Sequence, residues 1–356
     1  MIKYIGSKRR LVPAFGEMFA ASGARTALDL FTGTTRVAQE MKRRGMVVTA
    51  VDSARYAEVF AQCWIETDAG EIDRAELESA IDHLQHVPGE PGYVTDTFCV
   101  QSRFFQPHNG ERIDAIRDAI DRDFATSRLR PMLLTSLLLA ADRVDSTAGV
   151  QMAYIKSWAP RSYQPLALRV PQLLDGRGRA VRGDAAELAG ALGSFDLAYV
   201  DPPYNQHRYF TNYHIYETLV AWDRPAHYGV ACKRVDSRAP ETKSVFNEKR
   251  RFAEVLGRTI AAIDARVLML SYNNEAWVAL AELLEMCAGR GHVEAVALDA
   301  RRYIGAQIGI HSPTGEKVGS VSHVRNLEYV VVAGPRADVE RMVSAATDAG
   351  LARASL

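Results

Sequence analysis

The sequence predicts an α/β fold in which helices cover both faces of a mostly parallel sheet. Short apolar runs alternate with stretches of helical period along most of the 356 residues, which is typical of repeated strand–helix–strand units. The alternation stops once, between residues 67 and 179, where helical patterns follow one another with no strand pattern between them. These observations predict a sheet domain with one helical insert, and the chain is long enough for both.

The predicted strands are runs rich in Val, Leu and Ala, as expected of strands buried on both faces. They cover residues 26–31, 47–51, 195–200, 265–270, 293–298 and 327–333, and helices are predicted between them at 36–44, 252–262 and 277–288. The last strand follows a glycine-rich stretch, residues 305–319, and is expected to be an antiparallel edge strand.

The insert contains three predicted helices, at residues 74–86, 111–125 and 131–143. A segment follows in which Pro160, Pro165 and Pro171 prevent a continuous helix. We therefore divide the chain into a sheet domain of residues 1–66 and 180–335, a helical insert of residues 67–179, and a C-terminal helix or tail of residues 336–356.

The overall charge is zero, with 43 Lys and Arg against 43 Asp and Glu, which argues against a protein that binds polyanions by bulk charge. The charges are unevenly distributed, however. Residues 58–96 hold ten acids and one base, whereas residues 1–10, 143–182, 234–251 and 301–325 are basic. Each basic segment alone is more typical of solvated surface, but together they can line one cleft that binds a polyanion.

The four cysteines are isolated along the chain, so neither a disulfide framework nor a zinc or iron–sulfur site is expected. Isolated cysteines fit a reducing, cytoplasmic setting. No apolar run approaches the roughly 18 residues of a membrane span, and the N-terminus lacks an apolar signal segment. Neither a bound metal nor a membrane is therefore expected.

A turn of small residues follows the first predicted strand, in the order Asp29-Leu-Phe-Thr-Gly33-Thr-Thr35. Such a turn lets a ligand approach the backbone, but it has one glycine where a dinucleotide-binding turn has three. Asp52 ends the second predicted strand, where an acid can accept hydrogen bonds from ribose hydroxyls or cap the next helix. The pattern favours a nucleoside without a diphosphate over NAD or FAD.

The tetrapeptide Asp201-Pro202-Pro203-Tyr204 directly follows an apolar predicted strand, at the sheet edge where open α/β folds bind ligands. The two prolines fix the backbone and leave carbonyl acceptors beside the Asp201 carboxylate. These acceptors suit the exocyclic amine of a base, whose lone pair is otherwise delocalised into the ring. By accepting both amine hydrogens they would turn the lone pair towards an electrophile, while Tyr204 stacks on the ring.

With several other stretches, this motif resembles the Dam-like group of N6-adenine-specific DNA methyltransferases, and the resemblance covers most of the chain. The other matching stretches are Lys3-Tyr-Ile-Gly-Ser-Lys8, Asp29 to Gly33, Asp52, Gly183-Asp184, Ser271-Tyr-Asn-Asn274 and Asn326-Leu-Glu-Tyr-Val-Val. Thr35 departs from the pattern, since many members have a second glycine there. The resemblance implies a Rossmann-like methyltransferase fold with a seven-stranded sheet, in which residues 1–66 and 180–335 are the catalytic domain and residues 67–179 recognise DNA.

The resemblance also implies S-adenosylmethionine as the cofactor and an adenine flipped out of double-stranded DNA as the substrate. It implies that Asp201, Pro202, Pro203 and Tyr204 are catalytic. The implied cofactor residues are Tyr4, Ile5, Gly6, Lys8 (carboxylate), Asp29, Phe31, Gly33, Thr34, Thr35, Asp52 (ribose) and Asp184 (adenine amine). Taken alone, Lys8 would be a surface lysine and Asp184 the N-cap of a helix at 185–192.

Aromatic, amide and basic residues elsewhere are candidates for contacts to DNA. Residues 205–216 carry four rings among polar groups, and Tyr209, Asn212 and Tyr213 are the preferred members, whereas His214 and Tyr216 can begin the buried face of the next helix. The further candidates are Asn273, Arg143, Lys156, Trp158, Arg161 and Tyr163, with Arg301, Arg302 and Lys317 in a glycine-rich loop that can equally be a β-hairpin.

Other functions remain open from the sequence. N4-cytosine methylation can use the same four catalytic residues, RNA or a protein amide can replace DNA as substrate, and a DNA-binding protein can keep the fold without activity. The intact motif at 201–204 and Lys8 argue against an inactive protein, and the glycine pattern argues against a nicotinamide oxidoreductase. Whether a restriction endonuclease accompanies the protein is also left open.

Overall fold

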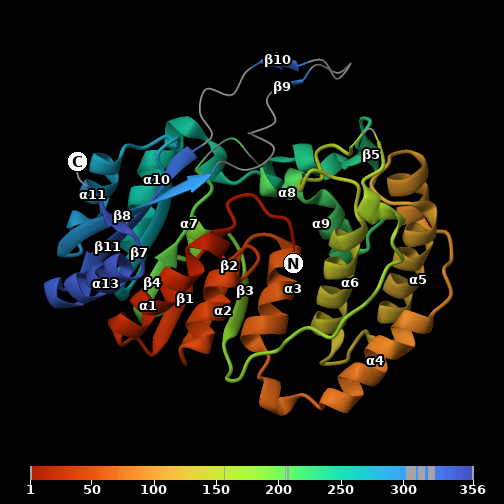
Figure 1. Cartoon of the computed structure of the whole chain (residues 1–356), viewed down its shortest axis with the longest axis horizontal. Helices are drawn as coiled ribbons and strands as arrows, with labels where there is room; N and C mark the ends of the chain where they lie inside the picture. The colour runs from red at the N-terminus through yellow and green to blue at the C-terminus, as the bar shows by residue number, and fades with distance from the viewer. Residues whose placement is uncertain are drawn as a thin grey trace.

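The computed structural model describes residues 2–155, 157–204, 206, 208–301, 310–311, 317–319 and 325–354. At its centre is an eight-stranded sheet with the order β12-β8-β11-β7-β4-β1-β2-β3 (Figure 1). The strands are β1 (Thr26–Asp29), β2 (Val47–Asp52), β3 (Arg179–Arg182), β4 (Phe195–Val200), β7 (Ala265–Asn273), β8 (His292–Arg301), β11 (Arg325–Gly334) and β12 (Ala352–Arg353). Neighbours from β3 to β7 pair in parallel, so the sheet is mostly parallel as predicted.

Three features of the sheet differ from the prediction. The sheet has eight strands instead of seven, because the two residues of β12 pair with β8. The strand β11 is antiparallel but is not at an edge: it lies between β7 and β8 and pairs with both, so its valines are buried on both faces. The apolar pattern also misses β3, because this edge strand has the sequence Arg-Ala-Val-Arg.

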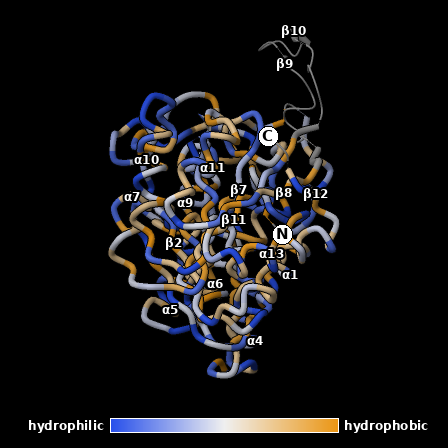
Figure 2. The backbone as a smooth tube through the Cα atoms, turned by 90° about the vertical axis from the view of Figure 1, so that its left-hand side faces the viewer, coloured by the Kyte–Doolittle hydropathy of each residue, from blue (hydrophilic) through white to orange (hydrophobic). Residues whose placement is uncertain are grey.

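Each face of the sheet is covered by its own set of helices, because alternate residues of a strand point to opposite faces. The helices α1 (Val12–Ser22), α2 (Arg36–Arg43) and α13 (Arg336–Asp348) pack on one face, where Tyr199 of β4 points. The helices α7 (Ala185–Leu188), α10 (Lys249–Ala262) and α11 (Leu280–Ala288) pack on the other, with Ala198 and Val200. In Figure 2, β7 and β11 lie between α11 on one side and α1 and α13 on the other.

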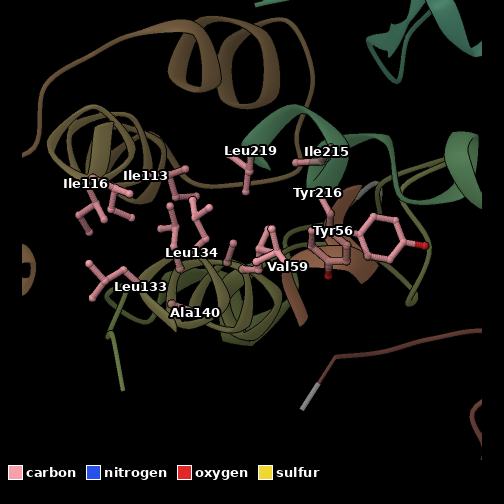
Figure 3. Packing of buried hydrophobic residues seen from close by; sticks show 14 of the residues in the cluster. Tyr56, Val59, Ile113, Ile116, Leu133, Leu134, Ala140, Ile215, Tyr216 and Leu219 are labelled. Carbon is pink, nitrogen blue, oxygen red and sulfur yellow. The ribbon is translucent and has the colours of Figure 1, made fainter. Parts of the chain in front are cut away.

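A second core lies beside the sheet and is built from helices. Its helices are α3 (Arg55–Ala61), α4 (Arg74–His86), α5 (Pro107–Phe124) and α6 (Arg130–Val144), which precede β3, and α9 (His214–Ala221), which follows β4. Figure 3 shows Tyr56 and Val59 of α3, Ile113 and Ile116 of α5, Leu133, Leu134 and Ala140 of α6, and Ile215, Tyr216 and Leu219 of α9 packed together. The insert of residues 67–179 therefore shares its core with α3 and α9, and the division into domains stays a prediction.

The helix α6 is buried on nearly all sides because its sequence is apolar all round. At its end the buried Asp142 accepts a hydrogen bond from the Tyr216 hydroxyl at 2.8 Å. The neighbouring Asp145 pairs with the Lys3 ammonium at 2.9 Å. These two acids join the N-terminal segment and α9 to the end of α6.

Smaller elements include α8 (Tyr209–Asn212), the hairpin of β5 (His227–Tyr228) and β6 (Lys233–Arg234), and the pair β9 (Ile310–His311) and β10 (Lys317–Gly319). The strands β9 and β10 pair in antiparallel fashion. None of the described helices is both long and apolar enough to cross a membrane.

Candidate active site

A cavity of about 570 Å³ lies where β1, β2 and β4 end, which is the size of a small-molecule site. Its wall combines the N-terminal segment, the turns after β1 and β2, the residues after β3 and the motif after β4. The predicted site residues on this wall are Tyr4, Ile5, Gly6, Lys8, Asp29, Phe31, Gly33, Thr34, Asp52, Asp184, Asp201, Pro203 and Tyr209. Segments far apart in the sequence meet here because the carboxyl ends of parallel strands share one edge of the sheet.

The turn after β1 is fixed by hydrogen bonds from both sides. Asp29 is 1% exposed, and its Oδ2 accepts a hydrogen bond from the Thr32 hydroxyl at 2.9 Å. Its Oδ1 is buried and has no hydrogen-bond partner among the described residues. Burial raises the pKa of Asp29 to about 7, although the Thr32 hydrogen bond opposes the rise. This carboxyl is therefore available to a cationic or donor group in the cavity.

Gly33 is required in this turn for its backbone and for the space around it. Its φ of +49° is in the left-handed region, and a Cβ would lie 3.1 Å from the Tyr4 ring. Its N–H donates to Asp52 Oδ2 at 2.9 Å, while Asp52 Oδ1 accepts from the Ala54 N–H at 2.9 Å. Asp52 thus links the turns that follow β1 and β2, and burial raises its pKa.

Asp184 and Thr35 differ in whether they face the cavity. The Asp184 carboxylate caps α7 by accepting from the Ala186 N–H at 2.8 Å, and the residue also lines the cavity. Thr35 does not line the cavity, contrary to the prediction. Its side chain is fully buried, and its hydroxyl accepts from Gln39 Nε2 at 2.9 Å within α2.

The Asp201 carboxylate, after β4, is paired with Lys8. The Lys8 Nζ lies 2.8 Å from Asp201 Oδ1 and 3.8 Å from Glu328 Oε2. Burial raises the pKa of Asp201 to about 6, the Lys8 ammonium opposes this rise, and the Glu328 carboxylate adds to it. Burial alone would lower the pKa of Lys8, but these two carboxylates raise it well above its usual value. Lys8, predicted to hold the cofactor carboxylate, therefore contacts the catalytic motif.

The other members of the motif lie behind Asp201. Pro203 lines the cavity, whereas Pro202 and Tyr204 are not on its wall. The Tyr204 ring packs edge-on against Tyr272, with ring centres 5.2 Å apart, and the Lys8 Nζ is 6.0 Å from the centre of the Tyr204 ring.

A layer of tyrosines supports the N-terminal segment. The Tyr4 ring stacks on Tyr213 at 4.6 Å and lies 5.4 Å from Tyr209, and the Ile5 N–H donates to the Tyr213 hydroxyl at 2.7 Å. Tyr209 lines the cavity, but Tyr213 is 1% exposed and Asn212 is also buried. The structure therefore contradicts the prediction that Asn212 and Tyr213 contact DNA, because both are enclosed where α8 meets α9.

A sequence model of the D12 class N6 adenine-specific DNA methyltransferases matches residues 4–272, a range that includes every cavity segment described above. The chain belongs to this family. The methyltransferase therefore acts on adenine N6 in DNA, which decides against cytosine N4 and against the other substrates considered from the sequence. Family membership also implies a methyl donor.

Curated relatives carry corresponding names. The type II methyltransferase M.NlaIII of Neisseria lactamica is 29% identical over 287 residues, which cover 77% of this chain and 83% of the relative. The modification methylase StsI of Streptococcus sanguinis is 27% identical, covering 85% of this chain and 49% of the relative. The type II methyltransferase M.FokI of Planomicrobium okeanokoites is 25% identical, covering 82% and 47%. The chain thus spans about half the length of the last two relatives.

Most of the candidate DNA contacts in the insert bind other residues of the same chain. Arg161 pairs with Asp145 at 2.7 Å, and Arg143 Nη2 donates to the Ala167 carbonyl at 2.5 Å. The Trp158 ring lies under the Arg103 guanidinium, 4.8 Å from its carbon. Tyr163 is 60% exposed and is free to meet a ligand. Lys156 and Arg302 lie outside the described residues, as do the side chains of Arg301 and Lys317.

Asn273, another predicted contact to the target base, is buried at the end of β7. Its Nδ2 donates to Glu328 Oε1 at 3.0 Å, and its Oδ1 accepts from the Glu275 N–H at 2.8 Å. Asn273 is not on the cavity wall. It is connected to the site by its hydrogen bond to Glu328, which in turn lies near Lys8. His214 and Tyr216 are buried on α9, as expected.

Sequence reasoning missed several residues at the site. Glu328 lies within a motif that carried the resemblance, yet nothing in its spacing indicates a contact with Lys8. Glu217 lines the cavity from α9, and burial raises its pKa to about 7. Arg36 also lines the cavity and makes no side-chain hydrogen bond or ion pair within the described parts of the chain. Across those parts, no group of three or more His, Cys, Asp or Glu side chains is placed to hold a metal ion.

Proposed function

We propose that this methyltransferase transfers the methyl group of S-adenosylmethionine to N6 of an adenine that has been flipped out of duplex DNA. The observation that carries the proposal is that one cavity joins Asp29, Asp52 and Asp184 to Asp201 and Pro203 of the catalytic motif. A nucleoside-like cofactor and a target amine can therefore lie within one cavity.

The residues of the cavity fit this cofactor. The unpartnered Asp29 Oδ1 is suited to the cofactor ammonium, Asp52 to its ribose hydroxyls and Asp184 to its adenine amine. Arg36 is a cation on the same wall and suits its carboxylate, whereas Lys8, the predicted partner of that carboxylate, is paired with Asp201. When bound there, S-adenosylmethionine supplies a methyl group on a positively charged sulfur.

The protein contributes orientation and polarisation to methyl transfer. The Asp201 carboxylate and the Pro202 carbonyl would accept the two hydrogens of adenine N6, which directs the nitrogen lone pair towards the methyl group. Asp201 has to be ionised for this role, and its pKa of about 6 leaves it mostly ionised above neutral pH. The same carboxylate is then a suitable acceptor for the proton that N6 loses after transfer.

DNA would approach the end of the molecule that carries the cavity. The basic segment at 234–251 contributes the exposed Lys243 to the cavity wall. The acidic helix α4 lies at the opposite end from α8 in Figure 1, away from this surface. Because the relatives are named type II methyltransferases and modification methylases, we further propose that the protein protects a specific sequence from a cognate restriction endonuclease.

The test is transfer of labelled methyl from S-adenosylmethionine to unmethylated genomic DNA, followed by mass spectrometry of the digested product. We expect N6-methyladenine with the wild type and loss of the label with Asp201→Asn. Asp348→Asn removes an exposed carboxylate at the end of α13 and should leave transfer unchanged. No incorporation by the wild type across varied DNA, or label found only on cytosine, would refute the proposal.

A further inference from the structure

A chain of polar contacts runs from Asp201 to the two antiparallel strands at the centre of the sheet. Lys8 Nζ lies 2.8 Å from Asp201 Oδ1 and 3.8 Å from Glu328 Oε2, and Asn273 Nδ2 donates to Glu328 Oε1 at 3.0 Å. Glu328 of β11 and Asn273 of β7 are direct partners in the register of the two strands. The sheet therefore fixes where the Glu328 carboxylate meets Lys8.

Placing a second carboxylate beside Asp201 has a cost, because like charges in a buried site repel each other. Accepting the amine of adenine requires only one carboxylate, so Glu328 calls for a separate explanation. Lysine is a compact charge on a flexible four-carbon chain and needs a second anchor to stay in one place. Glu328 provides that anchor, and the side chain of Lys8 is only 6% exposed between the two acids.

The other titratable groups that the structure describes around Asp201 carry no positive charge. They are Tyr199 on β4, Tyr204 in the motif, Tyr209 on α8, and Asp29 on β1, whose own pKa Asp201 raises. Among the groups that the structure describes here, the Lys8 ammonium is the cation that lowers the pKa of Asp201. Holding Lys8 in place therefore favours the ionised form of Asp201.

We propose that Glu328 is a positioning residue for methyl transfer: held by Asn273, it anchors Lys8 so that the ammonium keeps Asp201 ionised and directed at the target amine. This inference rests on the proposed function of Asp201. It assigns a task to the glutamate of the Asn326-Leu-Glu motif and makes Lys8 part of the methyl-transfer machinery.

The proposal predicts acid limbs of kcat that move in the same direction for variants of Glu328 and of Lys8. Glu328→Gln releases the Lys8 ammonium from its anchor, so the pKa of Asp201 should rise and the acid limb of kcat should move to higher pH, although loss of the Glu328 charge alone would move it to lower pH. Lys8→Met removes the cation, so that limb moves to higher pH. Because Lys8 is less well anchored without the Glu328 carboxylate, kcat of Glu328→Gln at pH 7.5 should also fall by roughly ten- to a hundredfold.

The experiment measures single-turnover methyl transfer against pH, with DNA and S-adenosylmethionine saturating, together with the thermal unfolding midpoint. Glu285→Gln removes an exposed acid on α11 and should match the wild type in rate and acid limb. If the wild type is active and Glu328→Gln equals it in rate and acid limb, the inference is overturned while the proposed function stands. A lower unfolding midpoint with an unshifted acid limb would also overturn it, and so would an acid limb at lower pH, because Glu328 would then act on Asp201 only as a like charge.

Asn273→Ala is a second variant in case Glu328→Gln does not fold. It removes the hydrogen bond that holds Glu328 without removing any charge. We expect a lower single-turnover rate for Asn273→Ala than for the wild type, with Glu328 still present. An unchanged rate would mean that anchoring by Asn273 has no part in the reaction, which overturns the proposal.

Discussion

Cofactor affinity should depend on pH through Asp29, whose pKa burial raises to about 7. If the cofactor ammonium binds the ionised carboxylate, lowering the pH below this value weakens binding because a proton has to leave first. A single group with this pKa is about 90% ionised at pH 8 and about 10% ionised at pH 6. The Kd should therefore increase about tenfold between pH 8 and pH 6, which is about 1.4 kcal/mol of binding free energy.

Isothermal titration calorimetry with S-adenosylhomocysteine tests this prediction. Near pH 6 the measured heat should also depend on the ionisation enthalpy of the buffer, since binding releases close to one proton. Asp29→Asn is the control: it should bind more weakly at pH 8 and change less with pH, while any titration of the ligand itself remains. Equal Kd values for the wild type at pH 6 and pH 8 would refute the reasoning.

Three further predictions concern the turn after β1, the tyrosine layer and the DNA surface. Gly33→Ala should weaken cofactor binding, as measured by titration calorimetry. Gly45→Ala also places a side chain at a positive φ but has nothing within 4 Å of the new Cβ, so it should lose only stability, about 1–2 kcal/mol in urea unfolding. Equal cofactor binding by the two variants would contradict this prediction. Tyr213→Phe removes the acceptor of the Ile5 N–H, so the free energy of unfolding measured with urea should fall by about 1 kcal/mol while DNA affinity stays the same. Weaker DNA binding with an unchanged free energy of unfolding would instead support Tyr213 as a DNA contact. The logarithm of DNA affinity should fall linearly with the logarithm of salt concentration despite the zero net charge. A DNA affinity that does not change with salt would mean that the basic segments do not share one surface.

The sequence predicts most of the fold because buried strands and amphipathic helices leave periodic patterns. The range 195–200 is found as β4 and the range 74–86 as α4. The central position of β11 is not predictable in this way, because an apolar run does not reveal which strands lie on its two sides.

Part of the site is predictable for a similar reason. Asp29 and Asp52 end apolar strands and Asp201 follows one, and the ends of parallel strands converge on one edge of the sheet. Contacts between distant segments leave no such pattern. Tyr213 has a polar group and lies close to the catalytic motif in the sequence, which suggests a ligand contact. It can be buried instead because its hydroxyl accepts a hydrogen bond from the Ile5 N–H. Arg161 resembles a DNA contact, but the buried Asp145 binds it.

The helices α3 and α9 limit how freely the proposed recognition insert could be exchanged between relatives. Replacing residues 67–179 by the corresponding stretch of another methylase would transplant one part of a core and leave another part behind, including Tyr56 and Val59 of α3 and Ile215, Tyr216 and Leu219 of α9. The grafted helices would have to fit those side chains before the methylase could fold. If the insert does recognise DNA, a change of specificity is therefore better sought in exposed residues such as Tyr163, or in a graft that includes α3 and α9.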